Sequence, residues 1–66
     1  MDAFNMTHAE RRQLAERLLP AGDKVIATTA YNGNAYNVQA VTESGEHYTV
    51  RVSCITLQLC GERYVG

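Results

Sequence analysis

Apolar residues near the start of the chain recur with the period of an α-helix. Leu14 and Leu18 are four positions apart, and so are Ala15 and Leu19, which places all four on one side of a helix. Mostly polar residues fill the positions between them. Residues 9–19 are therefore predicted to form an amphipathic helix that buries this stripe.

Both ends of the predicted helix carry signals of their own. Thr7 and Glu10 have the spacing of a capping box, in which the threonine hydroxyl and the glutamate carboxylate each accept a hydrogen bond from the other residue's backbone amide. Pro20 and Gly22 follow the stripe and favour the end of a helix. The helix is thus bounded on both sides.

Beyond the helix, apolar and polar residues alternate as they do in strands with one buried face. Asn32-Gly33 is a strong signal for a two-residue hairpin loop, because a type I′ turn needs a positive φ at both positions. This loop predicts pairing of Ala27 with Val38 and of Val25 with Ala40.

A second turn lies near Ser44-Gly45, and the length of its loop decides which side of the sheet each residue occupies. A two- or four-residue loop would place the apolar sets of the two hairpins on opposite faces. A three-residue loop over 43–45, with Gly45 in the left-handed conformation, keeps them on one face. We expect the three-residue loop, which pairs Ala40 with Tyr48, Val38 with Val50 and Tyr36 with Val52.

These registers predict a three-stranded meander with the helix over its apolar face. The other face should be mixed, largely polar and open to solvent. Its expected rows are Thr28, Asn37 and Arg51, then Ile26, Gln39 and Thr49, then Lys24, Val41 and His47.

The last segment is the least patterned. Ile55, Leu57 and Leu59 alternate with polar residues, which favours a strand that continues the third one after a bulge near Cys54, and a short helix over 55–60 is the alternative. Gly61 is expected to form a turn. The fold class predicted for residues 1–66 is a single small α+β domain with an N-terminal helix packed on a three- to four-stranded antiparallel β-meander.

Composition narrows the functional classes. The chain has 66 residues and a formal net charge of −1, which gives no long-range attraction for phosphate backbones or anionic lipid. It has neither an apolar run of the roughly 20 residues that cross a bilayer nor a basic-then-apolar leader. We therefore expect a cytoplasmic protein that does not bind membranes.

Candidate chemistry is sparse. His8 and His47 have no partners signalled by spacing, and Cys54 and Cys60 are too far apart on a strand for one metal or a disulfide. No phosphate loop, nucleophile motif or pair of carboxylates in an apolar setting occurs. We expect no enzyme activity, no catalytic residues, no metal and no cofactor.

Binding to another protein is the function that these observations favour. The predicted partner-binding residues are polar ones on the open face and the apolar row near the end: Asn37, Gln39, Thr49, Arg51, Ile55, Leu57 and Leu59. An uncharged alternating edge strand can pair with a partner protein or with a second copy in a homodimer. A domain of this size is also typical of inhibitors from phages and mobile elements that occupy a partner's surface.

The alternative function is a nucleic-acid-binding regulator. The order of elements, one helix followed by antiparallel strands, and the arginines of that helix suit such a role. The candidate residues are Arg11, Arg12, Arg17, Lys24 and Arg51. Single-strand binders stack bases on aromatic residues of an open sheet, whereas Tyr36 and Tyr48 are predicted to lie on the helix-covered face. Nucleic acid is therefore the second choice.

Overall fold

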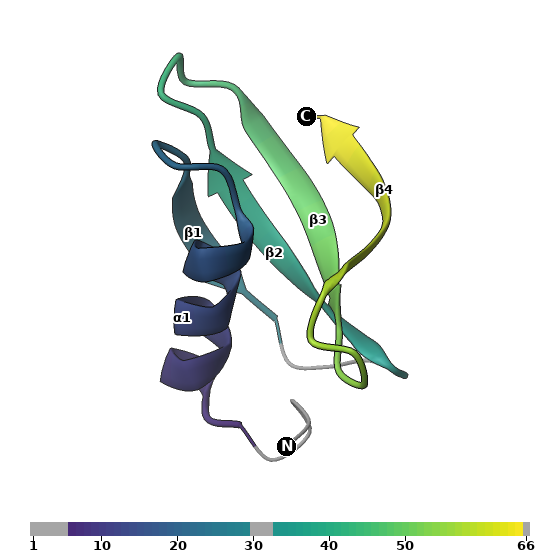
Figure 1. Cartoon of the computed structure of the whole chain (residues 1–66). Coiled ribbons are helices and arrows are strands. Elements are labelled where there is room, and N and C mark those ends of the chain that lie inside the picture. Colours follow the sequence, from purple (N-terminus) through teal and green to yellow (C-terminus); the bar gives the residue numbers. More distant parts are fainter. Residues whose placement is uncertain (1–5, 30–32, 66) are drawn as a thin grey trace.

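The computed structural model describes residues 6–29 and 33–65. One helix, α1 (His8–Leu18), precedes a sheet in the order β1-β2-β3-β4, in which each strand is antiparallel to its neighbour (Figure 1). The strands are β1 (Lys24–Thr28), β2 (Ala35–Val41), β3 (His47–Ser53) and β4 (Leu59–Val65). This arrangement confirms the predicted α+β class, with four strands in the meander.

The helix begins and ends close to where its signals lie. The Glu10 amide donates to Thr7 Oγ1 at 3.2 Å and the Thr7 amide donates to Glu10 Oε1 at 2.9 Å, so the capping box is formed. The bond from the Thr7 backbone amide to the Glu10 carboxylate, followed by hydrogen bonding from the Thr7 side chain, favours the charged form and lowers the pKa of Glu10. Leu19 is already extended, as expected of a residue that precedes proline.

The hairpin of β2 and β3 has the predicted register. Ala40 pairs with Tyr48, Val38 with Val50 and Tyr36 with Val52. Gly45 has a φ of +91°, and the Thr42 amide donates to the Glu46 carbonyl at 2.9 Å across the loop. The left-handed glycine and the three-residue loop are both confirmed.

The first hairpin differs from its prediction because β1 contains a bulge. Val25 pairs with Ala40 as expected, but Ala27 then pairs with Gln39, and Thr28 pairs with Val38. The predicted pairings of Ala27 with Val38 and of Ile26 with Gln39 are therefore wrong. A bulge adds one residue to one strand, so every residue beyond it changes face. Asn32 of the predicted loop lies outside the described residues.

Thr28 changes face because of this bulge. It was expected on the open face beside Asn37, but it is buried on the helix side, where its Oγ1 lies 3.3 Å from His8 Nδ1. Thr29 takes the position beside Asn37 instead: its amide donates to the Asn37 carbonyl at 3.0 Å.

The segment before β4 is a turn rather than a strand or a helix. Ser53 Oγ accepts hydrogen bonds from the amides of Ile55 and Thr56, each at 3.1 Å, and the Leu57 amide donates to the Ser53 carbonyl at 3.0 Å. Serine commonly binds following backbone amides in this way and so starts a turn. The predicted strand over 55–59 is wrong, and so is the alternative helix.

Strand β4 begins at Leu59 and continues past Gly61. Leu59 pairs with Val52 and Cys60 with Arg51, whereas Tyr64 pairs with Thr49, so that extra residues bulge between them. Gly61, with a φ of +71°, lies in this bulge instead of ending the segment.

The core lies between α1 and one face of the sheet. Its fully buried large side chains are Tyr36 and Val38 from β2, Tyr48 and Val52 from β3, and Cys54. In Figure 1 the helix lies on the side of β1 and β2, and β4 forms the far edge. One helix thus covers one face of the sheet, which leaves the other face available for function.

Candidate protein-interaction surface

The face of the sheet turned away from α1 carries the polar residues predicted to bind a partner. We call it the open face and define it by Asn37, Gln39, Thr49, Arg51 and Tyr64. Asn37 is paired with Arg51, and Gln39 with Thr49. Their neighbours along each strand are buried under the helix, because side chains alternate between the two faces. The structure therefore brings these four predicted residues together.

Tyr64 is a residue of this face that sequence reasoning missed. It is paired with Thr49 and is 61% exposed. The alternation of residues 55–59 predicts the last strand four residues too early and a turn at Gly61, so Tyr64 falls outside the predicted sheet. The available signal was the succession of Arg63, Tyr64 and Val65, because neighbouring residues of a strand point to opposite faces. In the structure Arg63 contacts the Tyr48 ring on the helix side, whereas Tyr64 lines the hollow of the open face.

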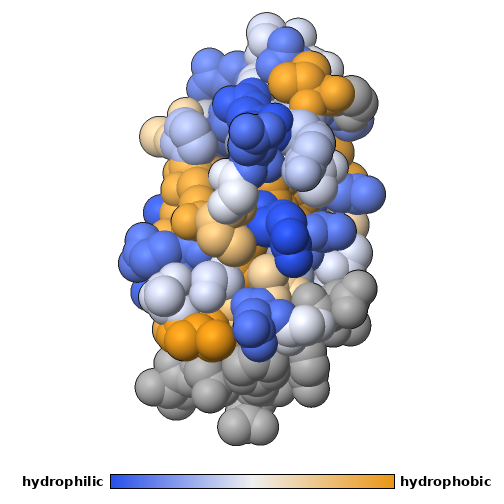
Figure 2. Space-filling view, turned by 90° about the vertical axis from the view of Figure 1, so that its right-hand side faces the viewer, coloured by the Kyte–Doolittle hydropathy of each residue, from blue (hydrophilic) through white to orange (hydrophobic). Residues whose placement is uncertain are grey.

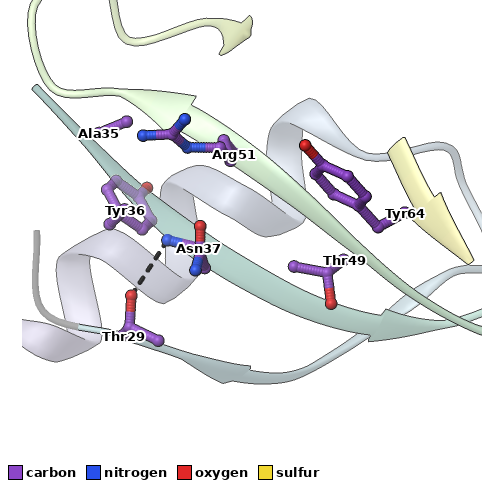
Figure 3. Close-up of a pocket in the computed structure, with 7 residues that line it drawn as sticks. All are labelled: Thr29, Ala35, Tyr36, Asn37, Thr49, Arg51 and Tyr64. Atoms are coloured by element: carbon purple, nitrogen blue, oxygen red, sulfur yellow. Dashed lines mark hydrogen bonds between the residues drawn. The ribbon is translucent and has the colours of Figure 1, made fainter. Parts of the chain in front are cut away.

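A hollow of about 300 Å³ lies on the open face (Figure 3). Figure 3 shows Arg51 and Thr49 from β3 and Tyr64 from β4 along one side, with Asn37 and Thr29 opposite. The backbone amide of Asn37 donates to Thr29 Oγ1 at 3.0 Å, and this bond holds the two residues together at the floor of the hollow. Tyr36 contributes little polar chemistry here, because its hydroxyl donates to the Arg11 carbonyl on the helix side at 3.1 Å.

A second hollow of about 300 Å³ adjoins the first. It is lined by Ile26, Gln39, Ala40, His47, Tyr48 and Thr49, so that Thr49 borders both. Ile26 lies in the β1 bulge and is 44% exposed. The open face therefore has an exposed apolar side chain, Ile26, at its β1 end and an exposed aromatic ring, Tyr64, at its β4 end.

The charge on this part of the sheet has one sign. Strands β1, β2 and β3 contain Lys24 and Arg51 but neither aspartate nor glutamate. Arg51 is exposed, and its guanidinium makes no hydrogen bond or ion pair with any described residue. In a chain of net charge −1, the part of the sheet formed by β1–β3 therefore carries only positive charge, and β4 adds Glu62 and Arg63.

Both edges of the sheet are poorly suited to pairing with another strand. At the β1 edge, Arg12 Nη2 donates to the Val25 carbonyl at 2.7 Å, and the strand is bulged. At the β4 edge, the bulge holds Glu62 and Arg63. Bulges and charges are the devices by which proteins prevent edge-to-edge pairing.

The predicted apolar row of Ile55, Leu57 and Leu59 does not exist as a row. Ile55 is 61% exposed in the turn, Leu57 packs against the core, and Leu59 starts β4 opposite Val52. The turn after Ser53 separates these residues, so an unbroken strand that presents all three to a partner is wrong. Figure 2, which views the β4 side, shows hydrophobic patches separated by hydrophilic side chains.

An apolar groove of about 230 Å³ lies on the helix side, between the end of α1 and β4. It is lined by Leu19, Pro20, Tyr48, Val50, Leu59, Cys60, Gly61 and Arg63. The Arg63 guanidinium carbon lies 3.7 Å from the centre of the Tyr48 ring, and its Nη2 is 3.4 Å from Glu46 Oε1. Arg63 is thus held over the groove by contacts within the chain.

Tyr48 at the floor of this groove is also bound by its hydroxyl. The hydroxyl donates to Asp23 Oδ2 at 2.5 Å. Burial, followed by the hydrogen bond and the charge of Asp23, raises the pKa of Tyr48 to about 12. These contacts are structural, because they join the loop after α1 to β3.

The residues proposed for nucleic-acid binding are not gathered on one surface. Arg11 donates to the Met6 carbonyl at 2.8 Å, and Arg12 binds β1 and Glu16, whereas Arg51 lies on the sheet face away from the helix. Near the β1 edge, a hollow of about 390 Å³ is lined by Arg12, Glu16, Asp23, Lys24 and Val25, a set with as many acids as bases.

The described part of the chain has neither a metal-binding cluster, nor a disulfide, nor a membrane-spanning helix. No cluster of three or more His, Cys, Asp or Glu side chains that could hold a metal occurs in residues 6–29 and 33–65. Cys54 is buried and Cys60 is half-buried, and no disulfide joins them. Over the same residues, no helix has the length and apolar composition needed to cross a bilayer.

Comparison with known proteins adds no family. No protein-family model, curated protein or solved structure matches the chain.

Proposed function

We propose that this chain is a small non-catalytic protein-binding module that occupies a partner protein's surface through its open face. The observation that carries this proposal is the placement of Tyr64 beside Thr49 and Arg51 on the sheet face that α1 leaves uncovered. Tyrosine and arginine are enriched among the residues that dominate binding energy in protein interfaces. Here they line one hollow that a partner's side chains can enter, and Thr49 borders both this hollow and a second one beside it.

The size of the molecule supports use of a whole face. A standard protein interface buries about 800 Å² on each partner. The accessible surface of the chain is 4283 Å², so such an interface would occupy about a fifth of it. Because bulges and Arg12 hinder pairing at the edges, the open face is the surface of this extent that we assign to binding.

The proposed mode of action is that of an inhibitor or regulator, and the proposed location is the cytoplasm. A domain that covers about 800 Å² of a partner can block whatever that area contacts. Self-association through the open face is disfavoured, because strands β1–β3 of each copy would bring Lys24 and Arg51 but no acid to the interface.

The test compares capture of partners by the immobilised chain and by two variants. Tyr64→Ala removes the exposed ring from the open face, and Arg17→Ala removes an exposed helix cation as the matched control. A hot-spot loss of about 2 kcal/mol corresponds to roughly thirtyfold weaker binding. We expect that loss for Tyr64→Ala with the purified partner, and unchanged affinity for Arg17→Ala. Equal binding by all three proteins would contradict the proposal.

A further inference from the structure

Arg51 is the charged residue of the hollow shown in Figure 3, and it is the group whose chemistry is unused. The other lining residues are Thr29, Ala35, Tyr36, Asn37, Thr49 and Tyr64, all of them uncharged side chains. The guanidinium carries five N–H donors in a planar fork. None of them is satisfied by a described residue, so the fork is available to a ligand.

We propose that this hollow receives an aspartate or glutamate side chain of the partner protein, with its carboxylate paired to Arg51. The inference rests on the proposed function and specifies the chemistry of the partner. Arginine and carboxylate form two parallel charge-assisted hydrogen bonds, a geometry that fixes orientation as well as adding energy. The Tyr64 ring then packs against the apolar stem or neighbour of that acidic residue.

The uncharged groups around Arg51 suit a carboxylate as well. Thr29 Oγ1 already accepts a hydrogen bond from the Asn37 amide, so its own hydroxyl hydrogen remains to be donated. The side-chain amide of Asn37 has two further N–H donors. Strands β1–β3 hold no carboxylate, and Glu62 of the neighbouring strand β4 makes no ion pair with Arg51.

The charges of β1–β3 favour a partner's carboxylate over the two other possible occupants, a second copy of this chain and a nucleic-acid backbone. A second copy of the chain would place Arg51 against a face whose described strands β1–β3 also carry cations and no acid. A nucleic-acid backbone is bound by several cations that follow its phosphates. Here the arginines of α1 lie on the other side of the sheet, and Arg51 stands with Lys24 alone among the cations of β1–β3. A single carboxylate in a protein surface matches this charge best.

The experiment titrates the isotope-labelled protein with N-acetyl-glutamic acid α-amide and, separately, with N-acetyl-glutamine α-amide. These probes differ only in the side-chain carboxylate. Nuclear magnetic resonance follows the Nε–Hε signal of Arg51 and the side-chain amide of Asn37. We expect saturable millimolar binding of the glutamate probe and at least about tenfold weaker binding of the glutamine probe.

Two variants test whether the effect belongs to Arg51. Arg51→Gln should abolish the response to the glutamate probe, whereas Arg17→Gln, which removes an equal charge from an exposed helix position, should preserve it. Both residues are exposed, and matching amide spectra will show that both variants are folded. Equal responses to the two probes, responses that persist in Arg51→Gln, or stronger binding of inorganic phosphate than of the glutamate probe would overturn the inference.

The partner assay separates failure of the inference from failure of the proposed function. If Tyr64→Ala weakens capture but Arg51→Gln does not, the open face binds protein and the carboxylate is wrong. If neither variant weakens capture, the open face is not the binding surface and both proposals fail. If both variants weaken it, and Arg51→Glu weakens it further, both proposals are supported.

Discussion

At the scale of single residues, a few polar contacts decide how the buried tyrosines are held. A buried tyrosine needs a partner for its hydroxyl, and each ring finds one outside the sheet: Tyr36 donates to the Arg11 carbonyl and Tyr48 to Asp23. Burial comes first among the causes that raise the pKa of both phenols. The helix and its following loop are therefore fastened to the sheet by hydrogen bonds as well as by apolar packing.

The raised pKa of Tyr48 predicts how stability depends on pH. The pKa is about 12 in the folded protein and about 10 in an unfolded chain, so the unfolded state loses its proton first as the pH rises. The contribution is fully present below pH 10 and is lost between about pH 10 and pH 12. Urea denaturation from pH 8 to pH 11.5 should show falling stability, with a shallower fall in Tyr48→Phe. Parallel curves for the two proteins would show that Tyr48 does not titrate as described.

The same contact predicts a cost for removing the hydroxyl at neutral pH. Tyr48→Phe leaves the Asp23 carboxylate without its donor, and hydrogen bonds to charged groups contribute about 1.5–3 kcal/mol. We expect a loss near 2 kcal/mol in the free energy of unfolding. Tyr64→Phe removes an exposed hydroxyl and should change stability by less than about 0.5 kcal/mol. Equal effects of the two substitutions in urea denaturation would contradict this reading of the core.

Leu57 is a position where replacement by glycine should destabilise the protein less than replacement by alanine. Its φ is +60°, in the left-handed region, where a side chain costs roughly 1–2 kcal/mol relative to glycine. Leu57→Ala and Leu57→Gly both lose the packing of Leu57 on the core, but only glycine relieves the backbone. We expect Leu57→Gly to be more stable than Leu57→Ala by about 1 kcal/mol in thermal or urea unfolding. Alanine is ordinarily the more stable of the two, so that order here would refute the conformation of this turn.

At the scale of elements, local signals determined some parts of the fold and not others. The register of β2 and β3 was predictable, because Gly45 specifies a three-residue loop and a buried face penalises a slip by one residue. The bulge in β1 was not, since alternation in a five-residue strand does not reveal an inserted residue. The C-terminal prediction failed because Ser53 starts a turn that the alternation of Ile55, Leu57 and Leu59 conceals.

The β1 edge predicts different roles for two arginines of the same helix. Arg12 donates to the Val25 carbonyl, whereas Arg17 is exposed without such a contact among the described residues. Arg12→Ala should lower the free energy of unfolding by about 1 kcal/mol, because it removes the hydrogen bond to the Val25 carbonyl. The exposed ion pair of Arg12 with Glu16 contributes little more. Arg17→Ala should change it by less than about 0.5 kcal/mol. Urea denaturation of both variants measures the difference, and equal losses would show that Arg12 does not stabilise the edge.

At the scale of the whole molecule, the distribution of surfaces follows from having one helix for four strands. The helix covers one face, so Asn37, Gln39, Thr49 and Arg51 could be placed together from register alone. Tyr64 and the Arg63 contact to Tyr48 could not, because both depend on a bulge of several residues in β4. The sequence thus indicates the polar part of the candidate surface, and the structure adds its aromatic part.

The same distribution predicts weak binding of nucleic acids. The cations of α1 and Arg51 lie on opposite sides of the sheet, so a single nucleic-acid backbone meets at most about two of them. A plot of the logarithm of the binding constant against the logarithm of the salt concentration should therefore have a slope near −2 or shallower. Fluorescence anisotropy with a labelled single strand and a duplex, at several salt concentrations, measures both quantities. We expect dissociation constants no tighter than about 10⁻⁵ M at physiological salt. Lys24→Ala combined with Arg51→Ala removes the cations of β1–β3 and should weaken this binding further, with a shallower salt slope. Submicromolar binding with a steep salt dependence, lost in Arg11→Ala combined with Arg12→Ala, would instead make the helix the functional surface and replace protein binding with nucleic-acid binding.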